Sequence, residues 1–178
     1  MPEVSEHAGT LDDQPTFWLQ APVTTPSPVV YLHGVPTSSE DWRPFLAQTG
    51  GFAPDLPGFG RAGKRGDLPC TMEFYDAWLE RFLDQRGIDR FSLLVHDWGG
   101  VGLLTAQRLA DRVDRVVVLN AAPLLPGYRW HWIAKVWRTP VLGEVFMGAT
   151  VRTTLRVLMR RGFKGRVPPQ LLDDVVRF

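Results

Sequence analysis

Short apolar, β-branched stretches alternate with helical patterns between residues 29 and 122, and this alternation restricts the fold more than any other feature of the chain. A stretch such as VVYLHG (29–34) has no polar alternation, which is typical of a strand buried on both faces of a sheet. Alternating strands and helices build a mostly parallel sheet with helices on both faces, so we expect the α/β class. The expected strands are 16–21, 29–34, 51–58, 90–97 and 113–122, and the expected helices are 39–50, 71–87 and 99–112.

The clearest helical pattern begins at Thr71, whose hydroxyl can cap the first turn. Phe74, Trp78 and Phe82 follow at intervals of four residues, which places them on one face of a helix. Gly87 supplies the left-handed residue that commonly ends a helix. This segment should therefore be a helix with one apolar face packed against the sheet.

The helix expected at 39–50 has weaker signals. Ser39 is a candidate N-cap, since its hydroxyl could accept a hydrogen bond from the first turn. Pro44 lies early in the segment and cannot donate a backbone hydrogen bond, so it should shorten the helix or keep it irregular.

The pattern of the chain changes near residue 128. Residues 1–128 carry 10 basic and 16 acidic groups, whereas residues 129–166 carry 9 basic groups and one acid, Glu144. Helical patterns follow one another in this second region, with no strand pattern between them. The sequence therefore predicts an α/β region over residues 1–127 and a helical subdomain over residues 128–178, laid over the strand ends.

One stretch, LLVHDWGG (93–100), places a carboxylate where a buried strand should end. Burying the ionised Asp97 without a partner would be costly, so this residue either caps the next helix or does chemistry. A nucleophile at the apex of a strand–turn–helix element is a known catalytic arrangement. The helix N-terminus would favour an ionised Asp97 and could stabilise an oxyanion, while Gly99 and Gly100 permit a sharp, closely packed turn.

Composition argues against several function classes. The net charge of +1 indicates no polyanionic partner such as nucleic acid, and no apolar run reaches the roughly 18–20 residues of a membrane span. We expect no metal, because H-E-x-x-H and paired cysteines are absent. With the lone Cys70 and no signal-peptide pattern, the expected location is the cytoplasm.

Two further features have simple interpretations. GFGRAGK (58–64) resembles nucleotide-binding motifs, but Arg65 stands where a P-loop needs Ser or Thr, and Gly66 and Pro69 argue against a following helix. The basic residues of 129–166 are expected to form a solvated helix face rather than a lipid or nucleic-acid surface.

Three motifs, HGVPTSSEDW, APDLPGFGRAGK and VHDWGG, together resemble the α/β-hydrolase fold family. The resemblance covers about residues 10–178 and is specific to the branch with an Asp nucleophile, which contains haloalkane dehalogenases and epoxide hydrolases. It implies that residues 1–127 form the N-terminal part of a hydrolase core and 128–178 part of a helical cap. It also implies a reaction without a cofactor, between water and a small apolar electrophile, either an alkyl halide or an epoxide.

The resemblance also implies roles for residues. Asp97 would be the nucleophile that forms an alkyl–enzyme ester, and the backbone N–H groups of Trp98 and Val35 would form the oxyanion hole. The Trp98 indole, a donor without a lone pair, could hold the leaving halide. The neighbouring loop residues His33, Gly34 and Pro36 would belong to the substrate site.

Features of the cap leave the substrate class open. Trp130, Trp132 and Trp137 either pack the cap onto the sheet region or include a second halide donor. Epoxide hydrolases use cap tyrosines, and Tyr128 lies only at the edge of this cap, which favours a dehalogenase. Many dehalogenases have a side chain at the position of Val35 that donates a hydrogen bond to the halide. Val35 has no such donor, which argues against a dehalogenase.

The family's catalytic histidine and acid have no evident counterpart in the sequence. His7 is expected in an N-terminal tail, His33 belongs to the loop motif, His96 should point to the opposite face from Asp97, and His131 opens the helical region. Asn120 occupies a place where some dehalogenases carry the acid. We therefore expect an N-terminal part of a longer hydrolase, lacking the final strands and catalytically incomplete. The edge of the last strand would be bare, which favours self-association.

Overall fold

The computed structural model describes residues 2–121, 129, 132–149, 151–160 and 166–177. The chain divides into two compact units, with the boundary at residue 122. The sequence-predicted boundary at 127/128 falls among residues that lie outside the described ranges.

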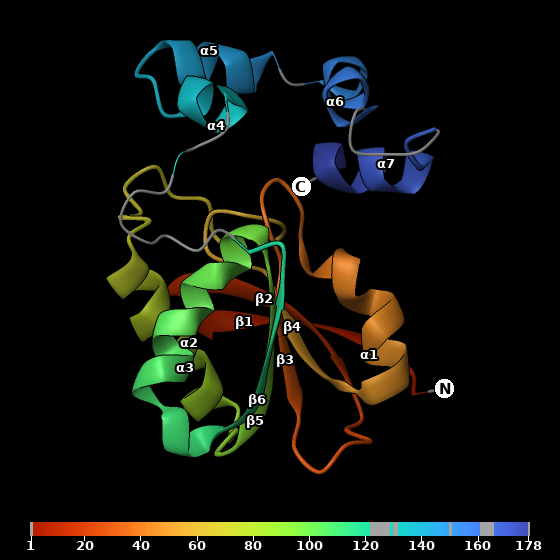
Figure 1. Cartoon of the computed structure of the whole chain (residues 1–178), viewed down its shortest axis with the longest axis vertical. Coiled ribbons are helices and arrows are strands. Elements are labelled where there is room, and N and C mark those ends of the chain that lie inside the picture. Colours follow the sequence, from red (N-terminus) through yellow and green to blue (C-terminus); the bar gives the residue numbers. More distant parts are fainter. Residues whose placement is uncertain (1, 122–128, 130–131, 150, 161–165, 178) are drawn as a thin grey trace. The chain divides into compact units, whose positions relative to one another are not determined.

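The first unit is built around a six-stranded sheet with the strand order β1-β2-β4-β3-β5-β6 (Figure 1). The pairs β4–β3, β3–β5 and β5–β6 are parallel, whereas β2 is antiparallel to β4 and β1 is antiparallel to β2. The mostly parallel α/β sheet predicted from the alternation is thus confirmed. The strands are β1 (Ser5–Leu11), β2 (Gln14–Ala21), β3 (Val29–Leu32), β4 (Gly51–Pro54), β5 (Phe91–His96) and β6 (Val113–Leu119).

Helices cover both faces of this sheet, as predicted. Helix α1 lies against one face, and α2 and α3 lie against the other (Figure 1). The helical segments are η1 (Ser39–Trp42), α1 (Arg43–Thr49), α2 (Met72–Gln85), η2 (Asp97–Val101), α3 (Gly102–Arg108) and η3 (Ala110–Arg112).

The signals predicted for α2 act as expected. The Thr71 hydroxyl accepts a hydrogen bond from the backbone N–H of Phe74 at 3.2 Å, and Gly87 has a φ of 65° just after the helix. Trp78 and Phe82 are buried and stacked on each other, with ring centroids 5.6 Å apart. Burying this apolar face anchors the helix to the sheet.

The N-cap predicted at Ser39 is wrong by one residue. Ser38 is extended, and its hydroxyl accepts a hydrogen bond from Glu40 N–H. Ser39 is instead wholly buried, and its backbone N–H donates to Asp55 Oδ1 at 2.6 Å. The irregularity expected from Pro44 is present, since a 3₁₀ turn precedes a short α-helix in which Pro44 occupies the first turn.

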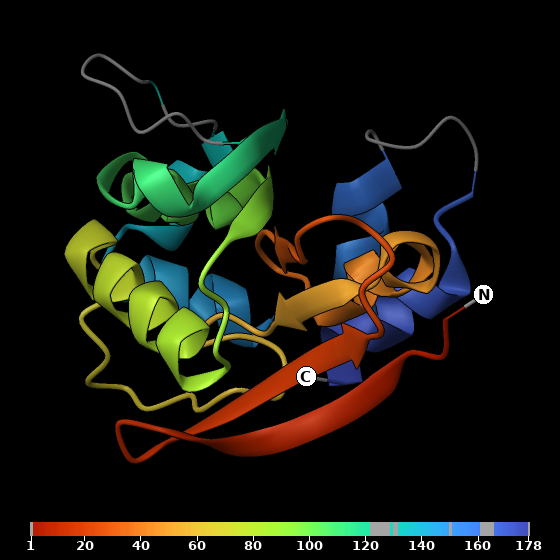
Figure 2. The ribbon, with the colours of Figure 1, turned by 90° about the horizontal axis from the view of Figure 1, so that it is seen from below.

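The N-terminal tail expected around His7 is in fact strand β1. It forms a hairpin with β2 whose two-residue turn, Asp12–Asp13, has φ values of 51° and 59° (Figure 2). Two left-handed residues match the twist of adjoining antiparallel strands. The His7 ring stacks on Trp18 of β2, with centroids 5.2 Å apart.

In the second unit, all regular elements among the described residues are helices. Leu155, Val167 and Leu172 form a small buried cluster, and Arg152 pairs with Asp173 at 2.8 Å. No helix in the described part of the chain is both long and apolar enough to cross a membrane. The helices are α4 (Trp132–Trp137), α5 (Leu142–Gly148), α6 (Arg152–Met159) and α7 (Pro169–Arg177).

Candidate active site

Asp97 occupies the turn between β5 and η2, where the chain leaves the sheet and enters helical structure. Its φ of 47° is in the left-handed region, which is uncommon for a residue with a Cβ. Such conformations persist only where the surrounding structure enforces them, and they cluster at functional sites. The carboxylate is half-buried at this turn.

Two glycines allow the chain to pack closely around Asp97. A Cβ at Gly34 would lie 2.5 Å from the Asp97 Cβ, and one at Gly99 would lie 2.3 Å from the carbonyl oxygen of Leu32. Both distances are far below van der Waals contact, so neither position accepts a side chain without movement. The absence of these side chains therefore brings the end of β3 and the Asp97 turn together.

The loop after β3 holds the Asp97 carboxylate directly. The backbone N–H of Val35 donates to Asp97 Oδ2 at 2.9 Å, although the two residues are 62 positions apart. Among the described residues, no group donates a hydrogen bond to the other oxygen, Oδ1. Gly34 and Pro36 flank this contact, and the Val35–Pro36 peptide bond is cis. The structure thus brings together Gly34, Val35, Pro36 and Asp97.

His33 supports this loop from beneath. It is wholly buried, its Nδ1 donates to the carbonyl oxygen of Gly34 at 2.9 Å, and its Nε2 accepts from the backbone N–H of Leu56 at 3.0 Å. Burial lowers the pKa of His33, against the opposing attraction of Asp55, so the ring is neutral with its proton on Nδ1. Because both nitrogens are occupied within the protein, the side chain positions the loop rather than lining the site.

Sequence reasoning did not identify Asp55 as part of this support. The carboxylate is wholly buried and accepts hydrogen bonds from the backbone N–H groups of Ser39 at 2.6 Å and Arg61 at 2.7 Å. A buried carboxylate needs such donors to offset its lost hydration. The signal for Asp55 was its place directly after the brief strand, within the APDLPGFGRAGK motif.

Trp98 is half-buried beside Asp97 and meets Tyr75 of α2 edge-on, with ring centroids 6.3 Å apart. Tyr75 is buried, and its hydroxyl donates to the carbonyl oxygen of Pro57 at 3.0 Å. Burial raises the pKa of Tyr75, so the phenol stays neutral. The predicted apolar face of α2 included its neighbours Phe74 and Trp78 but not Tyr75.

The described histidines do not hydrogen-bond to Asp97. His7 is in β1, His33 is buried beneath the loop, and His96 lies edge-on to Trp42 with centroids 6.5 Å apart. His131 lies outside the described residues. Within the described part of the chain, no group of three or more His, Cys, Asp or Glu side chains could hold a metal ion.

The three tryptophans expected in the cap belong to the second unit or lie outside the description. Trp132 and Trp137 are both in α4, where Trp132 is 57% exposed and Trp137 is half-buried. Trp130 lies outside the described residues. A role for these residues near Asp97 therefore stays a prediction.

Known proteins resemble this chain in sequence. A family model described as "alpha/beta hydrolase fold" matches residues 27–144. A haloalkane dehalogenase of Mycolicibacterium paratuberculosis is 34% identical over 151 residues, covering 75% of this chain and 48% of the relative. Haloalkane dehalogenase 1 of Mycobacterium bovis is 35% identical over 133 residues, covering 65% of this chain and 42% of the relative. The chain thus spans about half the length of these curated relatives.

Solved structures show the same fold. Haloalkane dehalogenase DbeA from Bradyrhizobium elkani superposes with a TM-score of 0.79 at 24% identity, covering 97% of this chain and 63% of that one. The epoxide hydrolase CorEH gives a TM-score of 0.78 at 22% identity, covering 98% of this chain and 68% of that one. With the family match over residues 27–144, this establishes that the chain belongs to the α/β-hydrolase fold family.

Proposed function

We propose that this chain carries the nucleophile of a hydrolase that cleaves carbon–halogen bonds, with Asp97 as that nucleophile. The observation that carries the proposal is the hydrogen bond from Val35 N–H to Asp97 Oδ2, at a residue with a left-handed backbone. That bond fixes one carboxylate oxygen and leaves the other available to a substrate. The relatives named haloalkane dehalogenase, at 34% and 35% identity, support the choice of substrate class.

In the first proposed step, Asp97 Oδ1 attacks the carbon that bears the halogen. A carbon–oxygen bond forms, the carbon–halogen bond breaks, and the halide leaves with the bonding electron pair. The product is an ester between the alkyl group and Asp97, in which Oδ2 is the carbonyl oxygen. We propose the Trp98 indole N–H as the donor that receives the halide, since Trp98 is next to the nucleophile and lies half-buried.

In the second proposed step, water attacks the carbonyl carbon of this ester. Negative charge then develops on Oδ2, the oxygen that Val35 N–H already contacts at 2.9 Å. A donor placed where charge develops stabilises the transition state, and we propose Trp98 N–H as its partner in this oxyanion hole. Collapse of the intermediate releases the alcohol and a proton and regenerates the Asp97 carboxylate.

The other predicted residues are assigned by the same proposal. Gly34 and Pro36 would face the substrate, while His33 would act by positioning their loop. Residues 1–127 would form part of the hydrolase core and residues 128–178 part of a cap, in which Trp130, Trp132 and Trp137 pack the cap or hold halide.

An epoxide hydrolase with the same Asp97 nucleophile is the second candidate. The observation that favours it is Val35, whose side chain offers no donor to a halide, although its backbone N–H serves the carboxylate. Opening an epoxide produces an alkoxide that must be protonated rather than a halide that must be held. The two candidates therefore differ in the leaving group and share the first bond-forming step.

The test is alkylation of Asp97. The folded chain would be incubated with 1-bromohexane or with 1,2-epoxyhexane, digested, and analysed by mass spectrometry. We expect one alkyl group on the Asp97 peptide, and the faster reagent identifies the substrate class. Asp97→Asn should abolish the adduct, whereas the exposed carboxylate control Asp89→Asn should not. A folded sample without an adduct, or an adduct that survives Asp97→Asn, would exclude this nucleophile.

Two finer expectations are also proposals. We propose that chains self-associate through the outer edge of β6, where Val116, Val117 and Val118 are 43%, 44% and 52% exposed. An open apolar strand is a template for pairing.

We also propose a cytoplasmic location, which the exposed, unpaired thiol of Cys70 supports.

A further inference from the structure

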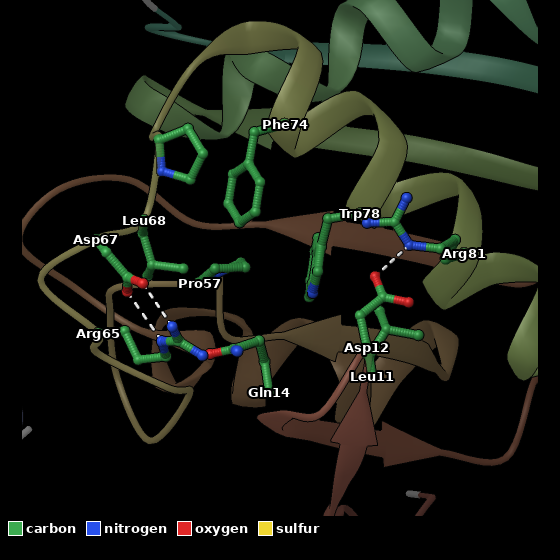
Figure 3. A pocket seen from close by; sticks show the side chains of 11 residues that line it. Leu11, Asp12, Gln14, Pro57, Arg65, Asp67, Leu68, Phe74, Trp78 and Arg81 are labelled. Carbon is green, nitrogen blue, oxygen red and sulfur yellow. Dashed lines mark hydrogen bonds and ion pairs between the residues drawn. The ribbon is translucent and has the colours of Figure 1, made fainter.

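The first unit has a pocket that the proposed hydrolase chemistry does not use. It measures about 260 Å³ and lies between the β1–β2 turn, the loop that follows β4, and helix α2 (Figure 3). Neither Asp97 nor any residue of the 33–36 loop lines it. A ligand in this pocket would therefore be recognised by a separate set of side chains.

The walls of the pocket are mainly apolar and partly aromatic. Phe74 and Trp78 project into it from adjacent turns of α2, and Leu68 and Pro57 face them from the loop (Figure 3). Small-molecule sites typically combine such walls with a few placed polar groups. An engineered apolar cavity of about 150 Å³ holds benzene, so a pocket of 260 Å³ has room for one substituted ring.

Trp78 supplies a hydrogen-bond donor inside this apolar pocket. The side chain is only 3% exposed, and no described residue accepts a hydrogen bond from its indole N–H. Figure 3 shows the nitrogen-bearing edge of the ring directed toward the β1–β2 turn, at one end of the pocket. Because this N–H faces the pocket and has no acceptor among the described residues, it is available to an acceptor from outside the protein.

The charged residues at the rim compensate one another. Arg81 pairs with Asp12, and Arg65 pairs with Asp67 (Figure 3). Two cations and two anions in mutual ion pairs leave no net charge for an ionic ligand to neutralise. This favours a neutral ligand over a carboxylate, a phosphate or an amine.

We propose that this pocket binds a small neutral aromatic molecule that carries a hydrogen-bond acceptor. The acceptor takes the Trp78 indole N–H, and the ring packs against Phe74 and Leu68. The proposal does not depend on the chemistry of Asp97, since the two sites share no lining residue.

Phenol and benzene are a matched pair of probes, because only phenol has an acceptor. We would titrate each into the isotope-labelled chain and follow the indole N–H signals by NMR, with the Trp78 signal identified by its loss in Trp78→Phe. Phenol should shift that signal and bind about 2- to 10-fold more tightly than benzene, which is the gain expected from one hydrogen bond. Trp78→Phe keeps an aromatic wall and should remove the preference for phenol.

Leu68→Trp provides a second variant, which fills the pocket from a half-buried loop position and leaves α2 intact. It should weaken the binding of both probes, even if Trp78→Phe does not fold. The control Trp132→Phe changes an exposed tryptophan of α4 and should leave both affinities unchanged. Asp97→Asn should do the same, which separates this pocket from the proposed hydrolase site. The proposal is overturned if phenol leaves the Trp78 signal unmoved, or if its affinity is the same in Leu68→Trp.

Discussion

At the scale of single residues, the site depends on the absence of a side chain at Gly34 as much as on the carboxylate of Asp97. The Asp97 side chain occupies space that a Cβ at position 34 would need. The same close approach allows Val35 N–H to reach Oδ2 at 2.9 Å. One small residue therefore sets the position of the carboxylate and of its hydrogen-bond donor together.

Gly34→Ala should damage both the fold and the site. The new Cβ would lie 2.5 Å from the Asp97 Cβ, so one of the two segments must move. We expect a loss of about 1–3 kcal/mol in the free energy of unfolding, as for other overpacked positions, and loss of Asp97 alkylation. Urea unfolding and the mass-spectrometric assay measure the two effects. Gly66→Ala is the matched control, because a Cβ there has nothing within 4 Å; equal effects of the two substitutions would contradict this explanation.

His33 makes stability depend on pH. Since burial lowers its pKa below the ordinary value of about 6.5, the unfolded chain binds a proton more readily than the folded chain. The His33 contribution is therefore complete above pH 6.5, roughly, and is lost as the pH falls below that value. The negative charges of Asp55 and Asp41 raise the pKa of His33 and so oppose the lowering by burial, whereas His96 lowers it further. One proton accounts for at most about 1.4 kcal/mol per pH unit.

Unfolding by urea between pH 7 and pH 5 measures this dependence. The unfolding free energy of the native chain should fall across the range more steeply than that of His33→Gln, which cannot take up the proton. His7→Gln, on the partly exposed ring in β1, should retain the native slope. Identical slopes for the native chain and His33→Gln would show that His33 does not cause the dependence.

At the scale of elements, local sequence signals identified α2 and missed β1. The boundaries of α2 depend on Thr71 and Gly87, which act within a few residues of themselves. β1 has an exposed face and little apolar patterning, and it exists because it pairs with β2 along its whole length. The Asp12–Asp13 turn was its one local signal, since aspartate tolerates the left-handed backbone that a two-residue hairpin needs.

The cap of α2 can be tested by Thr71→Ala. The substitution removes the hydroxyl that accepts from Phe74 N–H at 3.2 Å and leaves that donor without a protein partner. The free energy of unfolding should fall by about 0.5–2 kcal/mol, as measured by urea unfolding. Thr153→Ala, at an exposed position within α6, changes the same side chain without removing a cap and should have little effect. A cost of Thr153→Ala equal to that of Thr71→Ala would argue against the capping role.

At the scale of the whole molecule, only some of the contacts around the candidate site could be predicted from the sequence. The contact between the Asp97 turn and the 33–36 loop was expected from the resemblance, and it agrees with the rule that functional sites lie at the carboxyl ends of parallel strands. The buried hydrogen bonds between Ser39 and Asp55 and between Leu56 and His33 could not be predicted, because they join loops whose approach depends on the finished sheet. Long-range pairing of this kind leaves no periodic pattern in the sequence.

The open edge of β6 predicts how the chain behaves in solution. Sedimentation at micromolar concentration should show dimers. Val118→Lys should shift the distribution toward monomer, because a lysine on an edge strand opposes pairing. Val23→Lys is the matched control, an apolar residue that is 44% exposed outside the strands, and should not change the distribution. A native chain that sediments as a clean monomer would exclude self-association through β6.

The two outer strands of the sheet differ in a way that limits any such assembly. β1 ends the sheet with a mostly exposed, polar sequence that includes Ser5 and Glu6, and Glu6 is held by Arg43 at 2.8 Å. β6 ends it with consecutive valines. Each chain thus has one edge strand, β6, that favours pairing with another chain. When two β6 edges pair, only the polar β1 edges stay exposed, and these do not favour further strand addition. Growth should stop at a closed pair instead of continuing into a fibre.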